Sequence, residues 1–503
     1  MTMQVDSEDP AAARFDPNAS DRVAVLDVGS NSVRMVVYAP PARAPIPIFN
    51  EKVLCGLGRD FGRTGRLDPE GRTRALESLR RFARIAEAMS VRRVDAVATA
   101  AVREADDGAA FVAEARDSCG IDIRVLDGAE EARLSALGVL AGTPGAEGLM
   151  GDLGGGSLEL VELTGRDSGQ GVTLPLGSLR LSPLGDDAMP EIDAALGGVP
   201  WLDAHAGGNL FLVGGAWRAL ARIDARRLDY PLRVLHGYAV ARRHLLDLAT
   251  TVAGLGPASL ERIKGVSRER LADLPAAARV LIRLLAACRP KRVVFSAYGL
   301  REGLLFERLS AAEKRQDPLL VACRAIARQN ARFADQADAL VAWTAPLFGD
   351  ETTTAGRLRE AAALLSDIGW QVHPDYRPEQ AFLEVVRGPY VGLDHNERAR
   401  LALMVRARYT GRAEDAQVRA VAALLSEAQA LEARRVGQSL RLGLTISGGV
   451  PELLSATRLS IGRKRLRLHV RSEQAALAGL VVRKRLEALA DTMGRDGEVV
   501  IGD

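Results

Sequence analysis

Residues 27–36 of the chain read DVGSNSVRMV, and residues 152–161 read DLGGGSLELV. Both stretches have an aspartate, a glycine two positions later, a serine three positions after that, and a hydrophobic pair at the end. Each follows a hydrophobic run, so each predicts a β-hairpin with a glycine-rich turn. Strands and helices are expected to alternate around both copies, which predicts a duplicated α/β fold.

The turns of these hairpins carry groups that suit a phosphate. Backbone N–H groups of a glycine-rich turn form a concave anion site, and hydroxyl and amide side chains add further donors. The candidate phosphate ligands are Gly29, Ser30, Asn31 and Ser32 in the first turn and Gly154, Gly155, Gly156 and Ser157 in the second. A single turn of this kind is usually only a hairpin. Its repetition predicts a phosphoryl-transfer site with a phosphate chain held between two halves.

Acidic side chains accompany both turns. Asp27 and Asp152 open them, and Glu159 follows in the second hairpin. Mg²⁺ prefers a few carboxylates together with water and phosphate oxygens. We therefore expect Mg²⁺ as the cofactor, with Asp152, Asp27 and Glu159 as its ligands. Arg34 occupies the position that matches Glu159, so the two turns are not expected to be equivalent.

Composition narrows the class of protein. The 503 residues exceed what one hydrophobic core supports, so several domains are expected. A net charge of only +3 does not indicate a DNA-binding protein. The four cysteines lie far apart, and neither a signal peptide nor a membrane-spanning run is evident, which predicts a cytoplasmic protein with reduced thiols.

Changes of pattern along the chain predict five segments. Residues 1–21 are acidic and rich in proline and alanine, so we expect a disordered tail. Alternating strands and helices predict α/β domains over residues 22–141 and 142–315. Apolar spacing near 3.6 predicts a helical domain over residues 316–435. Residues 436–503 are expected to form a small basic α+β domain.

Both turns resemble the phosphate loops of the actin, chaperone and sugar-kinase superfamily. They are most similar to those of the exopolyphosphatase and guanosine pentaphosphate phosphohydrolase family. The segments VREA at 102–105, EEARL at 130–134 and SAYGLREG at 296–303 also match that family. The resemblance is specific from about residue 22 to residue 310, and it implies two duplicated actin-like, ribonuclease-H-like domains.

The resemblance also implies roles for single residues. Glu131, the second glutamate of the EEAR segment, matches the catalytic carboxylate that activates water, and Glu159 could raise its pKa by repulsion. Arg103 matches a phosphate-facing arginine, whose guanidinium can bind two phosphate oxygens. The residues alone leave alternatives open: an acid in the first turn of a helix usually faces the helix dipole, and Arg103 could be an exposed arginine at a helix start.

The helical segment resembles the His-Asp phosphohydrolase domains that this family appends. Ser366 stands before Asp367 where a metal-binding histidine is expected, and a hydroxyl is a much poorer ligand for transition metals than imidazole. We therefore expect a degenerate scaffold that extends a channel for a polymer and helps to form a homodimer. Arginines concentrated in residues 433–471 suggest a landing surface for a polyanion, or equally a solvated strand face.

Three functions remain to be weighed. The first is an exopolyphosphatase, a hydrolase that releases orthophosphate processively from the end of inorganic polyphosphate. The second is hydrolysis of guanosine pentaphosphate (pppGpp) to the tetraphosphate, and the third is a non-catalytic regulator that binds polyphosphate or (p)ppGpp. Trp217, after the glycines at 214–215, is expected to disfavour an adenine slot, and Arg301 is expected to form a structural pair with Glu302. The carboxylates and the C-terminal half favour the first function.

Overall fold

The computed structural model describes residues 21–40, 43–59, 61–266, 268–330, 332, 336–411 and 415–502. The predicted tail thus lies outside the described residues except for Asp21. The chain divides into two compact units. One contains Ser20–Pro318 and the short segment Pro389–His395, and the other contains Leu319–Gly388 and Asn396–Asp503.

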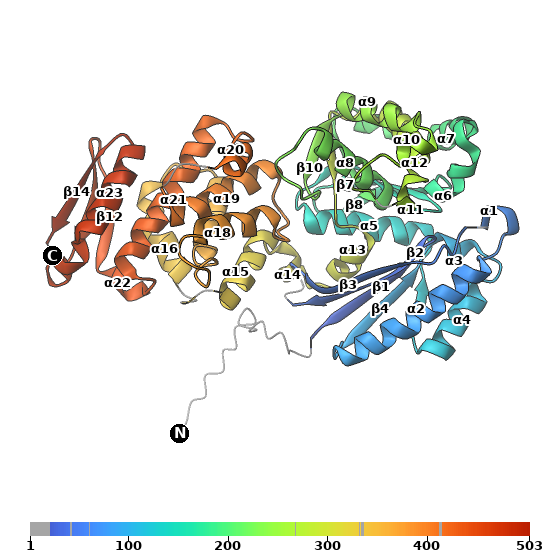
Figure 1. Cartoon of the computed structure of the whole chain (residues 1–503), viewed down its shortest axis with the longest axis horizontal. Coiled ribbons are helices and arrows are strands. Elements are labelled where there is room, and N and C mark those ends of the chain that lie inside the picture. Colours follow the sequence, from blue (N-terminus) through green and yellow to red (C-terminus); the bar gives the residue numbers. More distant parts are fainter. Residues whose placement is uncertain are drawn as a thin grey trace, which may run out of the picture. The chain divides into compact units, whose positions relative to one another are not determined.

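The first sheet of the N-terminal unit has the strand order β3-β2-β1-β4-β5. The strands are β1 (Val23–Val28), β2 (Ser32–Ala39), β3 (Ile46–Leu54), β4 (Arg93–Ala98) and β5 (Ile123–Val125). Strands β1, β2 and β3 are antiparallel neighbours, whereas β4 lies parallel to β1 and β5 parallel to β4. Helices α2 (Pro69–Ala88) and α4 (Gly108–Cys119) contribute to the hydrophobic core on one face of this sheet (Figure 1).

A second sheet repeats this arrangement, with the strand order β10-β11-β9-β6-β7-β8. Its strands are β6 (Glu147–Leu153), β7 (Leu158–Thr164), β8 (Ser168–Leu174), β9 (Asn209–Gly214), β10 (Tyr238–Ala241) and β11 (Arg292–Phe295). Strands β6, β7 and β8 are antiparallel, and β9 and β11 continue the sheet in parallel, just as β4 and β5 do in the first. The predicted duplication of the α/β fold is confirmed.

Two helices from distant parts of the sequence lie between the sheets: α5 (Gly128–Gly142) and α13 (Leu300–Glu307) (Figure 1). Their close packing requires glycine. A Cβ atom at Gly303 would lie 1.8 Å from the carbonyl oxygen of Leu134, and one at Gly138 would lie 2.1 Å from that of Gly299. Because both sheets and both helices share one hydrophobic core, the first turn of each helix has a fixed position relative to the hairpins.

Further helices complete the N-terminal unit. They are α1 (Phe61–Thr64), α3 (Ala100–Glu104), α6 (Ser178–Leu181), α7 (Ala188–Gly197), α8 (Gly215–Arg227), α9 (Arg242–Ala253), α10 (Pro257–Leu260), α11 (Arg268–Leu271), α12 (Leu274–Cys288) and α14 (Ala311–Arg315). The longest of those that follow the second hairpin, α12, is amphipathic and buries its apolar side in the core of the second sheet.

The C-terminal unit is helical and ends in a three-stranded sheet. Its helices are α15 (Pro318–Asn330), α16 (Gln336–Thr344), α17 (Thr353–Leu364), α18 (Arg377–Arg387), α19 (His395–Tyr409), α20 (Ala416–Ala422), α21 (Glu427–Ser447), α22 (Pro451–Ser455) and α23 (Leu480–Thr492). Its strands are β12 (Thr457–Ile461), β13 (Arg465–Val470) and β14 (Asp496–Ile501). Helix α21 runs across the predicted boundary at residue 435 and packs against α23.

The predicted fold class is therefore confirmed as α/β sheets followed by a helical region and a small sheet. The likeness of the helical region to a His-Asp domain stays a prediction. Among the described helices, none combines the length and the apolar character needed to cross a membrane. All four cysteines lie within the described residues, and they are not joined by disulfide bonds.

Candidate active site

The two hairpin turns have the same backbone geometry. The N–H of Gly29 donates to the carbonyl of Ser32 at 3.0 Å, and the N–H of Gly154 donates to the carbonyl of Ser157 at 3.0 Å. In register, Asp27 pairs with Arg34 across the first hairpin, as Asp152 pairs with Glu159 across the second. The sequence alignment of the two turns is thus also a structural one.

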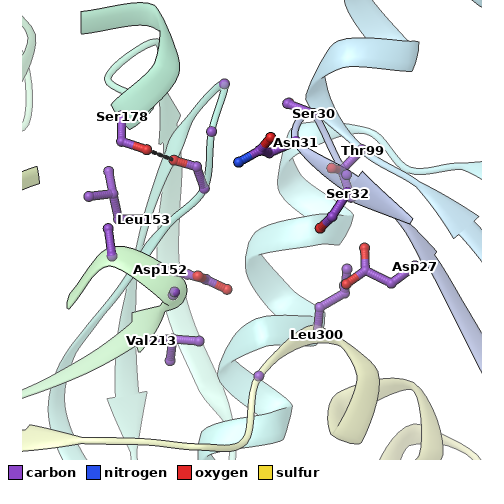
Figure 2. A pocket seen from close by; sticks show the side chains of 18 of the residues that line it. Asp27, Ser30, Asn31, Ser32, Thr99, Asp152, Leu153, Ser178, Val213 and Leu300 are labelled. Carbon is purple, nitrogen blue, oxygen red and sulfur yellow. Dashed lines mark hydrogen bonds between the residues drawn. The ribbon is translucent and has the colours of Figure 1, made fainter. Parts of the chain in front are cut away.

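The tips of the two turns approach each other closely. A Cβ atom at Gly155 would lie 3.2 Å from the Cβ of Ser30, and one at Gly156 would lie 2.8 Å from the Cβ of Ala100. Glycine is therefore required for this approach rather than for an unusual backbone angle. Helix α6 holds the second turn, since the N–H of Ser178 donates to the carbonyl of Gly154 at 3.1 Å. The hydroxyl of Ser178 donates to the same carbonyl at 3.3 Å (Figure 2).

A cavity of about 220 Å³ lies between the turns. Figure 2 shows Asp27 and Asp152 pointing into it from opposite sides. Its acidic and neutral polar lining residues are Asp27, Ser30, Asn31, Ser32, Thr99, Glu131, Asp152, Ser157, Glu159, Ser178 and Asp273. Every predicted turn residue and every predicted carboxylate lines this cavity, whereas Arg103 does not. The fold therefore gathers residues from both halves of the repeat.

Glu131 lies in the first turn of α5, after the N-cap residue Asp127, whose side chain accepts from the N–H of Glu130 at 2.7 Å. Its neighbour Glu130 is paired with Arg124, whereas Glu131 is buried and only 9% exposed. Burial is the main reason that the pKa of Glu131 is raised to about 7. Repulsion from Asp152 and Asp27 adds to the rise, and Arg103 opposes it. Glu131 and Glu159 also repel each other, so the expected repulsion from Glu159 acts together with that from the two aspartates.

Arg103 lies in the short helix α3 and holds Glu131. Its Nη1 donates to Oε2 of Glu131 at 2.7 Å and to the carbonyl of Leu126 at 3.0 Å. The contact fixes one carboxylate oxygen of Glu131. The predicted phosphate-facing role of Arg103 stays a prediction, since the guanidinium is engaged with Glu131 here.

Glu159 and Asp152 form an acidic pair on neighbouring strands, in which Glu159 is buried and Asp152 is half-buried. Glu159 is 1% exposed, and its Oε1 has no hydrogen-bond partner among the described residues. Burial raises the pKa of Glu159 well above its ordinary value, and Glu131 and Asp152 raise it further. Asp152 accepts from the hydroxyl of Ser135 at 2.7 Å, and burial raises its pKa as well.

The arrangement of these carboxylates shows whether they suit the predicted Mg²⁺. No group of three His, Cys, Asp or Glu side chains in the described part of the chain is arranged to hold a metal ion, so the set of Asp152, Asp27 and Glu159 is not preassembled. Mg²⁺ commonly binds through one or two carboxylates and completes its shell with water and phosphate oxygens. Asp27 and Asp152 meet that requirement, and the unpartnered Oε1 of Glu159 is a further oxygen that a cation or proton could satisfy.

Positive side chains that the sequence analysis did not assign to the site also line the cavity. They are Arg34, Lys52, Arg218, Arg270 and Arg301. Arg301 pairs with Glu302 as expected, with Nε 3.9 Å from Oε1, and its Nη1 also binds Oδ2 of Asp27 at 3.1 Å. Glu302 caps α13 by accepting from the N–H of Gly299 at 3.1 Å and also accepts from the hydroxyl of Tyr38 at 2.8 Å. The sequence signals for these cations were the GLREG segment for Arg301 and the repeat, which matches Arg34 with Glu159.

Trp217 does not face the cavity. The indole is fully buried in the core of the second sheet, and its Nε1 donates to the carbonyl of Ala277 at 3.0 Å. The inference that its bulk disfavours an adenine slot was wrong, because the next residue of α8, Arg218, is the one directed to the cavity. Neighbouring side chains on a helix point about 100° apart, and the sequence alone did not determine which side of α8 faces the cavity.

In the C-terminal unit, Asp367 is bound by arginines. Its carboxylate is 1% exposed and accepts from Nε of Arg332 at 2.8 Å and from Nη2 of Arg408 at 3.3 Å. Two guanidinium groups thus occupy the surroundings of the aspartate that would bind a metal in a His-Asp domain. This arrangement favours the predicted scaffold role, which stays a prediction.

The basic stretch 433–471 is partly neutralised. Arg465 and Arg467 both pair with Glu498, at 2.8 Å and 2.6 Å. Arg435 donates to the carbonyl of Thr492 at 2.8 Å. These contacts belong to the small sheet and its helices, so a landing surface could draw only on the remaining arginines of the stretch.

Comparison with known proteins gives consistent results. The family described as "Ppx/GppA phosphatase family" matches residues 36–312, and "Exopolyphosphatase, C-terminal" matches residues 319–500. Exopolyphosphatase 1 of Mycobacterium tuberculosis is 30% identical over 308 residues, which cover 58% of this chain and 89% of that protein. Exopolyphosphatase 1 of Mycobacterium leprae is 28% identical over 306 residues, covering 58% and 90%.

Solved structures agree on the fold. An exopolyphosphatase from Cytophaga hutchinsonii superimposes with a TM-score of 0.52 at 24% identity, over 57% of this chain and 97% of that one. The Ppx/GppA family member from Aquifex aeolicus gives a TM-score of 0.50 at 23% identity, over 58% and 99%. At this identity the likeness bears on the fold of the N-terminal unit alone.

Proposed function

The chain belongs to the Ppx/GppA phosphatase family, and from this premise we propose that it is an exopolyphosphatase that hydrolyses the terminal phosphate of inorganic polyphosphate. One observation carries the proposal. Glu131, a buried carboxyl with a pKa raised to about 7, lines the same cavity as both phosphate-binding turns. A carboxylate of this basicity can take a proton from water near neutral pH, which a site that only binds phosphate does not require.

The residues divide the reaction between them. The N–H groups and hydroxyls of the two turns hold the terminal phosphate, whose charge spreads over its equatorial oxygens in the transition state. Arg103 fixes Oε2 of Glu131, which leaves Oε1 to accept the proton of the attacking water. The P–O bond to the rest of the chain breaks, and orthophosphate leaves with the oxygen supplied by water.

Mg²⁺ is part of this proposal. Asp27 and Asp152 would hold the ion against the substrate, and when bound it neutralises charge on the phosphate oxygens. Glu159 lies beside them with a pKa well above its ordinary value, so a cation bound there would compete with its proton.

Hydrolysis of pppGpp is the second candidate. Trp217 gives no argument against it, because the buried indole does not line the cavity. The family covers both activities in its description, and the curated relatives are named for the first. Homodimer formation, binding of (p)ppGpp and a cytoplasmic location stay predictions.

The proposal is tested by phosphate release from long-chain polyphosphate and from pppGpp, at fixed Mg²⁺. Glu131→Gln should lower kcat on the order of 10²-fold or more, as loss of a positioned base does. Glu130→Gln is the matched control, since Glu130 lies on the same helical turn but pairs with Arg124. Faster release of phosphate from pppGpp than from polyphosphate would favour the second candidate, hydrolysis of pppGpp. No release from either substrate, or equal effects of the two substitutions, would contradict a hydrolase that uses Glu131.

A further inference from the structure

One part of the cavity is lined by cations without acidic partners. Arg34, Lys52, Arg218 and Arg270 reach it from β2, β3, α8 and α11. Within the described part of the chain, no carboxylate lies within ion-pair distance of any of them. Their hydrogen bonds go to neutral groups: Arg34 to the Asn50 amide at 2.9 Å, Arg218 to the Gly214 carbonyl at 3.1 Å, and Arg270 to the Gly215 carbonyl.

These cations repel one another. Burial lowers the pKa of Lys52 to about 8, and the charges of Arg270 and Arg34 act in the same direction. Burial also lowers the pKa of Arg218 to about 10, with three neighbouring guanidinium groups adding to the effect. Positive charges held together away from water raise the free energy of the folded chain unless an anion compensates them. The nearby Asp273 supplies one carboxyl, whose own pKa is raised to about 6 by burial.

The lining of the cavity does not suit a nucleobase. Among the described residues that line it, none is aromatic, so a purine has no ring to stack on. The surface of Gly215 is covered by Arg270, since a Cβ atom added to that glycine would lie 2.4 Å from the guanidinium Nη1. Planar guanidinium groups and an ammonium group are instead the donors that phosphate oxygens select.

We propose that Lys52, Arg218 and Arg270 form a second phosphoryl-binding site, which holds phosphate groups of the substrate other than the one being cleaved. The inference rests on the proposed function, since it concerns the remainder of the same substrate. The three residues come from elements outside both hairpin turns, so this site is separate from the one that holds the terminal phosphate. Occupation by phosphate would remove the mutual repulsion and keep Lys52 protonated.

Two substrates could supply such a group: the following phosphates of a polyphosphate chain, or the 3′-diphosphate of pppGpp. The two sources are distinguished by ligands that share the 5′ end but differ elsewhere. A length series from pyrophosphate to long polyphosphate varies the chain. GTP and pppGpp differ in the 3′-diphosphate alone.

The experiment measures equilibrium binding of these ligands to the full chain carrying Glu131→Gln, in the absence of Mg²⁺, so that turnover is slow compared with the measurement. Lys52→Gln is the leading variant, because the Lys52 side chain has no hydrogen-bond or ion-pair partner to lose among the described residues, and Arg270→Gln is the second. Lys52→Arg keeps the charge, and Arg166→Gln removes a charge from an exposed loop outside the cavity.

We expect Lys52→Gln and Arg270→Gln each to weaken binding of long chains about tenfold, while pyrophosphate binding changes little. Lys52→Arg and Arg166→Gln should leave both unchanged. If the variants instead abolish a preference for pppGpp over GTP, the second site binds the 3′-diphosphate.

An equal loss for every ligand, or no loss for any, would overturn the second site. Failure of the proposed function is a separate result, since it appears as absence of phosphate release by the wild-type chain. Binding that still depends on chain length and on Lys52 would support the second site even then.

Discussion

The two hairpin turns share a backbone and differ in charge. Both close with the same hydrogen bond, and both begin with an aspartate. Asp27 lies against Arg301 at 3.1 Å, and the residue across its hairpin is Arg34. Asp152 accepts from the neutral hydroxyl of Ser135, and the residue across its hairpin is Glu159. One copy of the repeat is therefore cationic and the other acidic.

This difference shows how a duplicated fold can acquire an asymmetric site. Glycine-rich turns give both halves the same capacity to bind phosphate oxygens. A hydrolase also needs a region that attracts a polyanion and a region where a carboxylate is basic enough to take a proton from water. The first hairpin lies beside the cations of the cavity, and the second lies beside Glu131 and Glu159. We expect substitutions at matched positions to have unequal effects.

The largest expected difference concerns the metal requirement. Asp152→Asn should lower activity at limiting Mg²⁺ on the order of 10²-fold and raise the Mg²⁺ needed for half-maximal rate. Asp27→Asn should have a smaller effect, because Arg301 already neutralises that carboxylate. Magnesium titrations of phosphate release would check this. Identical titration curves for the two variants would remove the distinction between the turns.

Stability should change in the opposite order. Asp27→Asn leaves Arg301, whose side chain is 13% exposed, without its aspartate and should lower the free energy of unfolding by about 1–3 kcal/mol. Asp152→Asn removes a carboxyl whose ionised form is disfavoured by burial, so it should cost less. Urea denaturation at pH 7 compares the two variants. A greater loss for Asp152→Asn would contradict the charge assignment.

The pH dependence should shift when Glu131 loses its partner. Activity should rise with pH through about 7, because Glu131 must be ionised to accept a proton. Arg103 lowers the pKa of Glu131, so Arg103→Gln should move this rise to higher pH. If Glu131 becomes a tenfold weaker acid, its ionised fraction at pH 7, and with it kcat/KM, falls about fivefold. If Arg103→Gln lowers kcat/KM at every pH without moving the rise, Arg103 binds phosphate instead.

The smallest effect is expected for stability as a function of pH. The folded-state pKa of Glu159 is raised above its unfolded value, so its contribution is present at low pH and is lost as pH rises. This contribution should fall as pH rises above roughly 4.3, so Glu159→Gln should make the stability of the chain decrease less steeply with pH, by at most about 1.4 kcal/mol per pH unit. Arg34→Gln, at the matching position, should leave the slope unchanged in the same denaturation series.

Much of the fold and part of the site could be predicted before the structure. The spacing of aspartate, glycine and serine predicted both turns, because a hairpin turn depends on neighbouring residues. The EEAR resemblance identified Glu131, although periodicity alone would have left it as a helix-dipole partner. The position of Trp217 was missed, because side-chain direction on α8 depends on how that helix packs against the second sheet.

The cations were missed for a related reason. Lys52 lies in a strand and Arg270 in a four-residue helix, and neither local pattern indicates a ligand. They meet Arg34 and Arg218 only when β2, β3, α8 and α11 come together around one cavity. The pKa of Glu131 likewise depends on burial and on Asp152 and Asp27, which are distant from it in the sequence.

The sequence by itself determined the two hairpin turns, the donors they present and the duplication of the α/β fold. Tertiary structure alone decided which carboxylate is basic, which aspartate is neutralised and where the cations gather. The physical reason is the distance over which each kind of interaction acts. Turn geometry and hydrogen-bond donors are set by residues a few positions apart, whereas burial and Coulomb interactions act through space between residues that only the fold brings together.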